Sequence, residues 1–115
     1  MIVDDNSKMR QMIRNILQCN LNQEIEIFEC DSGEEAVEQY DIFSPDWVLM
    51  DIKLNKMNGL TAAEIITKKY PQTKIIVVTQ YNEAVYKNKA KKIGVSAFVL
   101  KDNLQELVTI IKNVL

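Results

Sequence analysis

The sequence contains no histidine, which is the residue that most often supplies a general base, a metal ligand or a phosphoryl carrier. Any histidine chemistry must therefore come from a partner. The only two cysteines are Cys19 and Cys30, with no Cys-x-x-Cys pair. This usage fits a reducing compartment, and we expect a cytoplasmic location. One interpretation of the two cysteines is a redox pair. We favour the other, two small buried apolar side chains.

Long apolar runs and an excess of basic charge are also absent. No apolar run approaches the ~20 residues that cross a bilayer, and no basic-then-apolar leader precedes the first strand pattern. We therefore expect neither a membrane span nor a signal peptide. The chain carries 14 basic and 16 acidic side chains, whereas direct nucleic-acid binding normally needs a basic face. Four lysines between residues 87 and 92 are interpreted as a solvated helix face.

The sequence does contain a strand–helix alternation that is repeated five times. Short apolar runs predict strands at residues 1–4, 25–30, 47–50, 74–79 and 96–100. Three- and four-residue apolar spacing predicts helices at residues 7–20, 33–44, 60–69, 83–93 and 103–115, with Ser7 and Ser32 as N-caps and Pro45 after the second. Strands that are apolar on both faces are typical of a covered parallel sheet. We therefore expect one domain of the α/β class, a doubly wound five-stranded parallel sheet with five helices on both faces.

Polar side chains follow four of these strands at their carboxyl ends. Asp4 and Asp5 follow the first strand and Asp51 the third, while Thr79 ends the fourth and Lys101 follows the fifth. The carboxyl ends of parallel strands lie along one edge of a sheet, where open α/β sheets bind ligands. We therefore expect these five side chains to meet in one pocket.

Such a pocket is suited to phosphoryl chemistry. Three carboxylates repel one another unless a cation lies among them, and Mg²⁺ prefers oxygen ligands. The Lys101 ammonium and the Thr79 hydroxyl could then contact the oxygens of an incoming phosphoryl group. One carboxylate would act as nucleophile and form an acyl phosphate, and Asp51 is the best placed because it is central and single.

This arrangement resembles the receiver domain of two-component response regulators. The Asp4-Asp5 pair, Asp51, Thr79 and Lys101 all stand in the family's order, and Met57-Asn58-Gly59 matches the loop after the phosphoacceptor. The resemblance covers residues 1–115, for which we expect one receiver domain with the flavodoxin-like strand order 2-1-3-4-5.

For the metal site, the resemblance implies a Mg²⁺ cofactor bound by the side chains of Asp5 and Asp51 and by the backbone carbonyl of Lys53. Asp4 would contact the metal through water or lie behind the ligands.

For the reaction, the resemblance implies Asp51 as phosphoacceptor, with Thr79 and Lys101 binding the phosphoryl oxygens. Phe98 matches the switch aromatic that turns inward when Thr79 is drawn to the phosphate. The alternative for Phe98 is an ordinary core side chain. Any enzymatic activity would be limited to self-catalysed phosphoryl transfer and hydrolysis of the acyl phosphate.

The resemblance also implies partners. The donor would be a sensor histidine kinase or a phosphotransfer protein. The face formed by residues 83–93, 96–100 and 103–115 would be reshaped for a partner or for a homodimer. Asp102 stands where the family often has proline, and a Lys-Asp sequence there looks like receivers attached to helix-turn-helix regulators. The resemblance therefore leaves two alternatives, a stand-alone receiver and a receiver followed by a DNA-binding output domain in a longer chain.

Two other functions also fit this sequence. The first is a pseudo-receiver, an interaction module without phosphoryl turnover. Asn55 stands where the family often has proline, and Gln80 stands where it usually has a small residue. The second is a small-molecule enzyme on the same topology, which would need a phosphate-cradling loop where Asp4-Asp5 stands. In the simplest interpretation, the acidic pair only caps a helix, and Asp51 and Lys101 form a surface ion pair.

Overall fold

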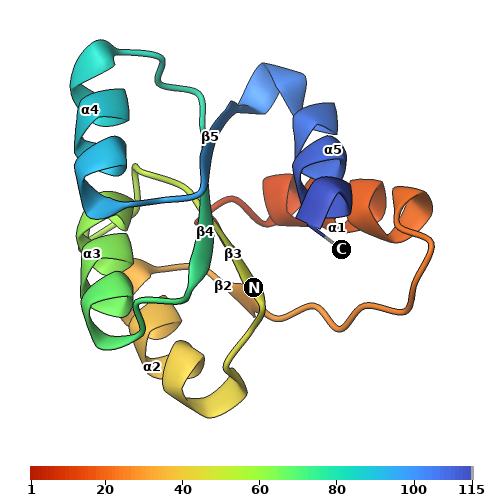
Figure 1. Cartoon of the computed structure of the whole chain (residues 1–115), viewed down its shortest axis with the longest axis horizontal. Helices are drawn as coiled ribbons and strands as arrows, with labels where there is room; N and C mark the ends of the chain where they lie inside the picture. The colour runs from red at the N-terminus through yellow and green to blue at the C-terminus, as the bar shows by residue number, and fades with distance from the viewer. Residues whose placement is uncertain (115) are drawn as a thin grey trace.

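Five parallel strands form one sheet in the order β2-β1-β3-β4-β5 (Figure 1). The computed structural model describes residues 1–114. The strands are β1 (Ile2–Val3), β2 (Glu29–Cys30), β3 (Trp47–Met50), β4 (Lys74–Thr79) and β5 (Ala97–Leu100). The helices are α1 (Ser7–Asn20), α2 (Gly33–Phe43), α3 (Gly59–Lys69), α4 (Ala84–Ile93) and α5 (Gln105–Val114), with a 3-10 turn η1 (Lys101–Asn103) before α5. The expected doubly wound sheet and its strand order are confirmed.

The helices cover both faces of the sheet, α1 and α5 on one side and α2, α3 and α4 on the other (Figure 1). The interior strand β4 shows why this layering is stable. Ile76 and Val78 pack into the core cluster formed with α1 and α5, whereas Ile75 and Val77 pack toward the opposite helices. Alternate side chains of a strand point to opposite faces, so a strand with two covered faces is apolar throughout.

The first two strands are shorter than predicted. Residues 25–28 were expected in a strand, but only Glu29 and Cys30 pair, with Ile2 and Val3 of β1. In this order β1 is the only neighbour of β2, and it offers only two paired residues. The alternating pattern of residues 25–28 therefore reflects partial burial against the core, because Ile25 and Ile27 are half-buried there.

The helix ends follow local hydrogen bonding. Ser7 was expected to cap α1, but the N-cap is Asn6, whose Oδ1 accepts hydrogen bonds from the Lys8 and Met9 amides at 3.0 and 3.1 Å. The predicted Ser32 cap of α2 is confirmed by a 3.1 Å bond from the Glu35 amide. The last helix was predicted for residues 103–115. It begins at Gln105, and residue 115 lies outside the described residues.

Both cysteines are free thiols, but they differ in burial. Cys30 is buried, whereas Cys19 is exposed, so the expectation of two buried side chains is wrong for Cys19. Cys19 lies two positions after the buried Leu17 on α1, and two helical residues turn the side chain about 200° away. Within residues 1–114, no helix is long and apolar enough to cross a membrane.

Candidate functional site

Three carboxylates meet at the carboxyl ends of β1 and β3. These strands pair in parallel, with Val3 beside Met50, so Asp4 and Asp51 follow neighbouring positions. One carboxylate oxygen each from Asp4, Asp5 and Asp51 lies within 4.8 Å of the others. Asp4 and Asp51 are 2% and 5% exposed, whereas Asp5 is exposed to solvent. The acidic cluster is therefore buried at its base and open at Asp5.

Lys101 joins this cluster from the end of β5. Its Nζ lies 2.8 Å from Asp4 Oδ2 and 3.1 Å from Asp51 Oδ2. Burial alone would lower the pKa of Lys101, but the hydrogen bond to Asp4 and the charge of Asp51 outweigh burial and raise it. Lys101 is therefore an ammonium that bridges two buried carboxylates.

The Asp51 carboxylate has a raised pKa and a fixed orientation. Burial raises its pKa, the charge of Lys101 acts in the opposite direction, and the nearby charge of Asp4 raises it further, so that the net shift is upward. Its Oδ1 accepts a 2.8 Å hydrogen bond from the Ile52 amide. That bond fixes the rotation of the carboxylate while Oδ2 contacts Lys101.

The donor set fits a hard divalent cation. The three carboxylates supply only oxygen atoms, and a single ammonium leaves excess negative charge among them. Mg²⁺ suits such oxygen ligands and retains several waters, for which the exposed Asp5 side leaves access. Lys53 lies two residues beyond Asp51, and its ammonium is 5.4 Å from the ring centroids of both Tyr81 and Tyr86. The metal-binding role of its carbonyl stays a prediction.

Thr79 and Phe98 lie on the same face of adjacent strands. In the β4–β5 pairing Val77 stands beside Phe98, and Thr79 is two positions after Val77. Side chains two apart in a strand share a face. Thr79 is fully buried, and its Oγ1 accepts the Tyr81 amide at 3.2 Å. Phe98 is half-buried against the cluster of Ile52, Leu60, Val77 and Ala90, with the Lys87 ammonium 5.9 Å from its ring centroid.

The loop after Asp51 is held by direct backbone packing. A Cβ atom placed on Gly59 would lie 1.7 Å from the Asp51 carbonyl oxygen. The Gly59 amide donates a 2.8 Å hydrogen bond to the Ile52 carbonyl, and Asn58 Oδ1 caps α3 by accepting the Leu60 amide at 2.7 Å. The start of α3 therefore lies against the phosphoacceptor candidate, a contact that the sequence pattern around Gly59 did not disclose.

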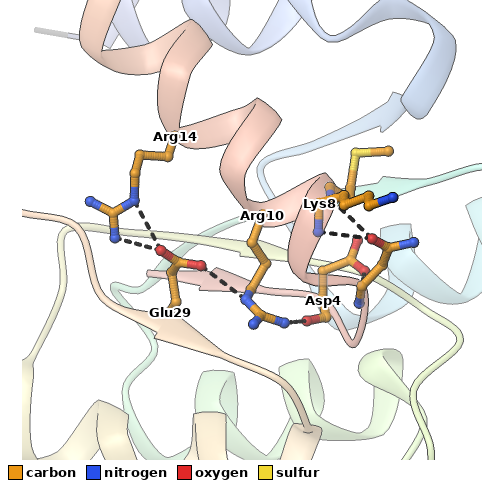
Figure 2. Close-up of polar contacts among 7 residues, drawn as sticks. Asp4, Lys8, Arg10, Arg14 and Glu29 are labelled. Atoms are coloured by element: carbon orange, nitrogen blue, oxygen red, sulfur yellow. Dashed lines mark hydrogen bonds and ion pairs between the residues drawn. The ribbon is translucent and has the colours of Figure 1, made fainter.

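Arg10 also reaches the acidic cluster, although sequence reasoning did not select it. Its Nη1 donates a 2.6 Å hydrogen bond to the Asp4 carbonyl (Figure 2). A basic residue on an amphipathic helix is ordinarily a surface residue, and no local pattern marks this one. The contact depends on the fold, because it joins α1 to the end of β1.

Comparison with known proteins gives a consistent family match. The profile of the response regulator receiver domain matches residues 1–112. The chain is 38% identical over 101 residues to the chemotaxis protein CheY of Thermotoga maritima, covering 88% of this chain and 82% of that protein. It is 32% identical over 101 residues to the transcriptional regulatory protein DegU of Brevibacillus brevis, covering 88% of this chain but only 42% of that protein. With LnrK of Bacillus subtilis, another transcriptional regulatory protein, it shares 31% identity over 115 residues and spans 50% of that relative.

Solved structures give the same result. The DNA-binding response regulator of the LuxR family from Staphylococcus aureus superposes with a TM-score of 0.88 at 32% identity, covering 98% of this chain and 94% of that chain. A LuxR-family two-component response regulator from Aurantimonas superposes with a TM-score of 0.90 at 27% identity, covering 99% and 81%. Both likenesses extend over nearly the whole chain, so the acidic cluster lies within a shared fold.

Proposed function

The chain belongs to the response regulator receiver family, and on that premise we propose that it is a phosphorylation switch with Asp51 as phosphoacceptor. The observation that carries the proposal is the meeting of Asp4, Asp5 and Asp51 around the Lys101 ammonium. The phosphoryl donor would be the phosphohistidine of a sensor kinase or phosphotransfer protein, since the chain itself has no histidine.

In the proposed reaction, an Asp51 carboxylate oxygen forms a bond to phosphorus while the bond from phosphorus to the donor nitrogen breaks. The Lys101 ammonium and the Thr79 hydroxyl stabilise the phosphoryl oxygens as charge develops on them. Asp5 and Asp51 would hold Mg²⁺ together with the Lys53 carbonyl, and Asp4 would act through water. The bound metal would offset the negative charge that otherwise opposes approach of the phosphoryl group.

The proposed output lies on the face of α4, β5 and α5. Thr79 would move toward the phosphoryl group, and Phe98 would turn into the space beside it. The shared face of Thr79 and Phe98, and the contact of Phe98 with the cluster that contains Ala90 of α4, support this coupling. A switch of this kind needs two arrangements separated by a few kcal/mol, with the new charge favouring one.

For the partners, we propose that the reshaped face binds a second copy of the chain or an effector. DegU and LnrK are transcriptional regulatory proteins, and the chain spans 42% and 50% of their lengths. A longer chain with a DNA-binding output would agree with this proportion. We also propose a cytoplasmic location, because the donor kinase domain would have to reach the acidic cluster.

Labelling with a small phosphodonor tests the phosphoacceptor. With Mg²⁺ and acetyl phosphate, intact-mass analysis should show one added phosphoryl group, and Asp51→Asn should show none. Label on the variant would identify another nucleophile. A wild type that takes no label from acetyl phosphate or from kinases would instead be a pseudo-receiver.

A phosphoryl mimic tests the switch. Amide shifts are compared with and without beryllofluoride and Mg²⁺, and changes are expected at Thr79, Phe98 and along α4. If the mimic binds at Asp51 while Thr79 and Phe98 keep their shifts, the proposed coupling is wrong.

A further inference from the structure

Arg10 lies between the acidic cluster and β2, where it contacts backbone on one side and a carboxylate on the other (Figure 2). We propose that Arg10 is a positioning residue for the cation site, because it fixes the Asp4–Asp5 peptide and thereby the Asp5 carboxylate. This inference rests on the proposed function, since it assigns a support to the same site.

Asp4 is held at four points, two of them on its backbone. Its amide donates to the Cys30 carbonyl at 3.1 Å, and its carbonyl accepts from Arg10 Nη1 at 2.6 Å. Its side chain is fixed at both oxygens, with Oδ1 accepting the Asn6 amide at 2.9 Å and Oδ2 lying 2.8 Å from Lys101 Nζ. Among these contacts, only the one from Arg10 acts on the peptide that leads to Asp5.

The position of the Asp5 carboxylate depends on the Asp4–Asp5 peptide more than the positions of the other two carboxylates do. Its side chain is exposed, whereas Asp4 and Asp51 are buried and held by Lys101. A peptide unit is planar, so fixing the Asp4 carbonyl also fixes the Asp5 amide and the direction of its Cα atom. Mg²⁺ demands near-ideal octahedral geometry. A support that sets the Asp5 backbone therefore sets how well the third carboxylate meets the metal.

Arg10 is itself anchored. Its Nε donates to Glu29 Oε1 at 2.9 Å, and Arg14 binds the other oxygen of Glu29 through Nε and Nη2 at 2.9 and 2.6 Å. The exposed fractions of the three side chains are 17%, 32% and 29% for Arg10, Arg14 and Glu29. Glu29 and Cys30 together form β2. The Cys30 carbonyl binds the Asp4 amide directly, and Glu29 holds Arg10, which binds the Asp4 carbonyl. β2 therefore supports the Asp4 backbone both directly and through Arg10.

Charge and geometry predict opposite effects of removing Arg10. A guanidinium beside a cation site repels Mg²⁺, so charge alone predicts tighter binding when Arg10 is made neutral. Loss of the Arg10 hydrogen bond to the Asp4 carbonyl predicts weaker Mg²⁺ binding. Arg14 is a matched control in the same chain, because it binds the same Glu29 but makes no hydrogen bond to Asp4.

The experiment compares Mg²⁺ affinity, measured by calorimetric or amide-shift titration without any phosphodonor, in the wild type, Arg10→Met and Arg14→Met. We expect Arg10→Met to bind Mg²⁺ about tenfold or more weakly, the range found when supports of metal ligands are removed. Arg14→Met should bind as tightly as the wild type or slightly more tightly. Arg10→Lys should recover part of the affinity, since an ammonium can reach the carbonyl but lacks the planar fork.

Urea unfolding separates this effect from folding. Both methionine variants lose an ion pair to Glu29, and Arg10→Met also loses the hydrogen bond to the Asp4 carbonyl, so Mg²⁺ affinities are compared under conditions where both variants are folded. Should Arg10→Met fail to fold, Glu29→Gln removes the anchor while keeping Arg10, and it should also weaken Mg²⁺ binding. If the wild type binds Mg²⁺ and the folded Arg10→Met or Glu29→Gln variant binds it equally or more tightly, the positioning role of Arg10 is wrong. The proposed function is not affected by that result. A wild type without Mg²⁺ affinity overturns the proposed function together with this inference.

Discussion

Gly59→Ala should damage the acidic site although it adds only one methyl group. The added Cβ would lie 1.7 Å from the Asp51 carbonyl oxygen and 2.8 Å from its carbonyl carbon. Both atoms belong to backbone, which cannot rotate away as a side chain could. Relief of the clash therefore requires movement of the start of α3 or of the Asp51 backbone itself.

The magnitude follows from two opposing effects. Alanine favours a helix over glycine by about 1 kcal/mol, whereas overpacking in a tight site costs about 1–3 kcal/mol and occasionally more. An overlap of this depth lies at the upper end, so we expect the free energy of unfolding to fall by about 2 kcal/mol. If Asp51 moves by about 1 Å, phosphorylation should slow by roughly 100-fold, since misplaced reacting groups have effects of that size.

Gly94→Ala is the matched control. Gly94 has φ of 92°, which strains an L side chain, but an added Cβ would meet no atom within 4 Å. This variant should lose about 1–2 kcal/mol of stability through strain at the left-handed backbone, with the acidic site intact. Urea unfolding and the rate of acetyl phosphate labelling are measured for both variants at a temperature where both are folded. Labelling of Gly59→Ala at the Gly94→Ala rate would refute the close-packing argument.

Three further predictions concern charge. Without Mg²⁺, Lys101→Met should lower the free energy of unfolding by about 3 kcal/mol, because Asp4 and Asp51 lose their bridging ammonium. Added Mg²⁺ should restore part of this stability, which urea unfolding with and without Mg²⁺ measures. Asp51→Asn should raise the thermal midpoint of the metal-free protein at pH 7, because burial raises the Asp51 pKa and the ionised form opposes folding. That advantage should shrink as the pH falls toward the ordinary value of 3.8, and an unchanged difference across the range would contradict it. When residues 1–115 are prepared with a free amino group on Met1, burial lowers the pKa of that group from 8.0 to about 6. The unfolding free energy of this sample should rise by about 2–3 kcal/mol as the pH increases through this window, and acetylation of the amino group should abolish the rise.

The sequence was sufficient for the sheet and for the place of its polar residues. Strands with two covered faces are apolar throughout, which makes a polar residue at the strand end conspicuous. Asp51 after β3 and Thr79 at the end of β4 could be assigned to one edge because parallel strands carry their carboxyl ends together. The assignment needed only the carboxyl ends of these strands and their parallel direction, and the strand–helix alternation predicts that direction.

The errors arose where the outcome depends on non-local contacts or on two equivalent candidates. Asn6 and Ser7 are both good N-caps, and the choice depends on where the chain leaves β1. Ile25 and Ile27 alternate as in a strand, but a ladder also needs a neighbour of equal length. The Arg10 contact with the Asp4 carbonyl joins residues six apart through a turn that sequence patterns do not specify.

The contacts of Lys101 also explain what phosphorylation would have to change. Lys101 is shared between Asp4 and Asp51, so it offsets charge that would otherwise oppose folding of the cluster. Under the proposed function, conversion of the Asp51 carboxylate to an acyl phosphate removes one carboxylate charge and places phosphoryl oxygens beside the ammonium. Lys101 would then exchange its contact with Asp51 for one with the phosphoryl group, while Asp4 keeps its bonds to Asn6 and to Arg10. Under the proposed function, the β1 end would therefore be the fixed part of the site. The β4–β5 side with Thr79 and Phe98, which faces α4, would be the movable part.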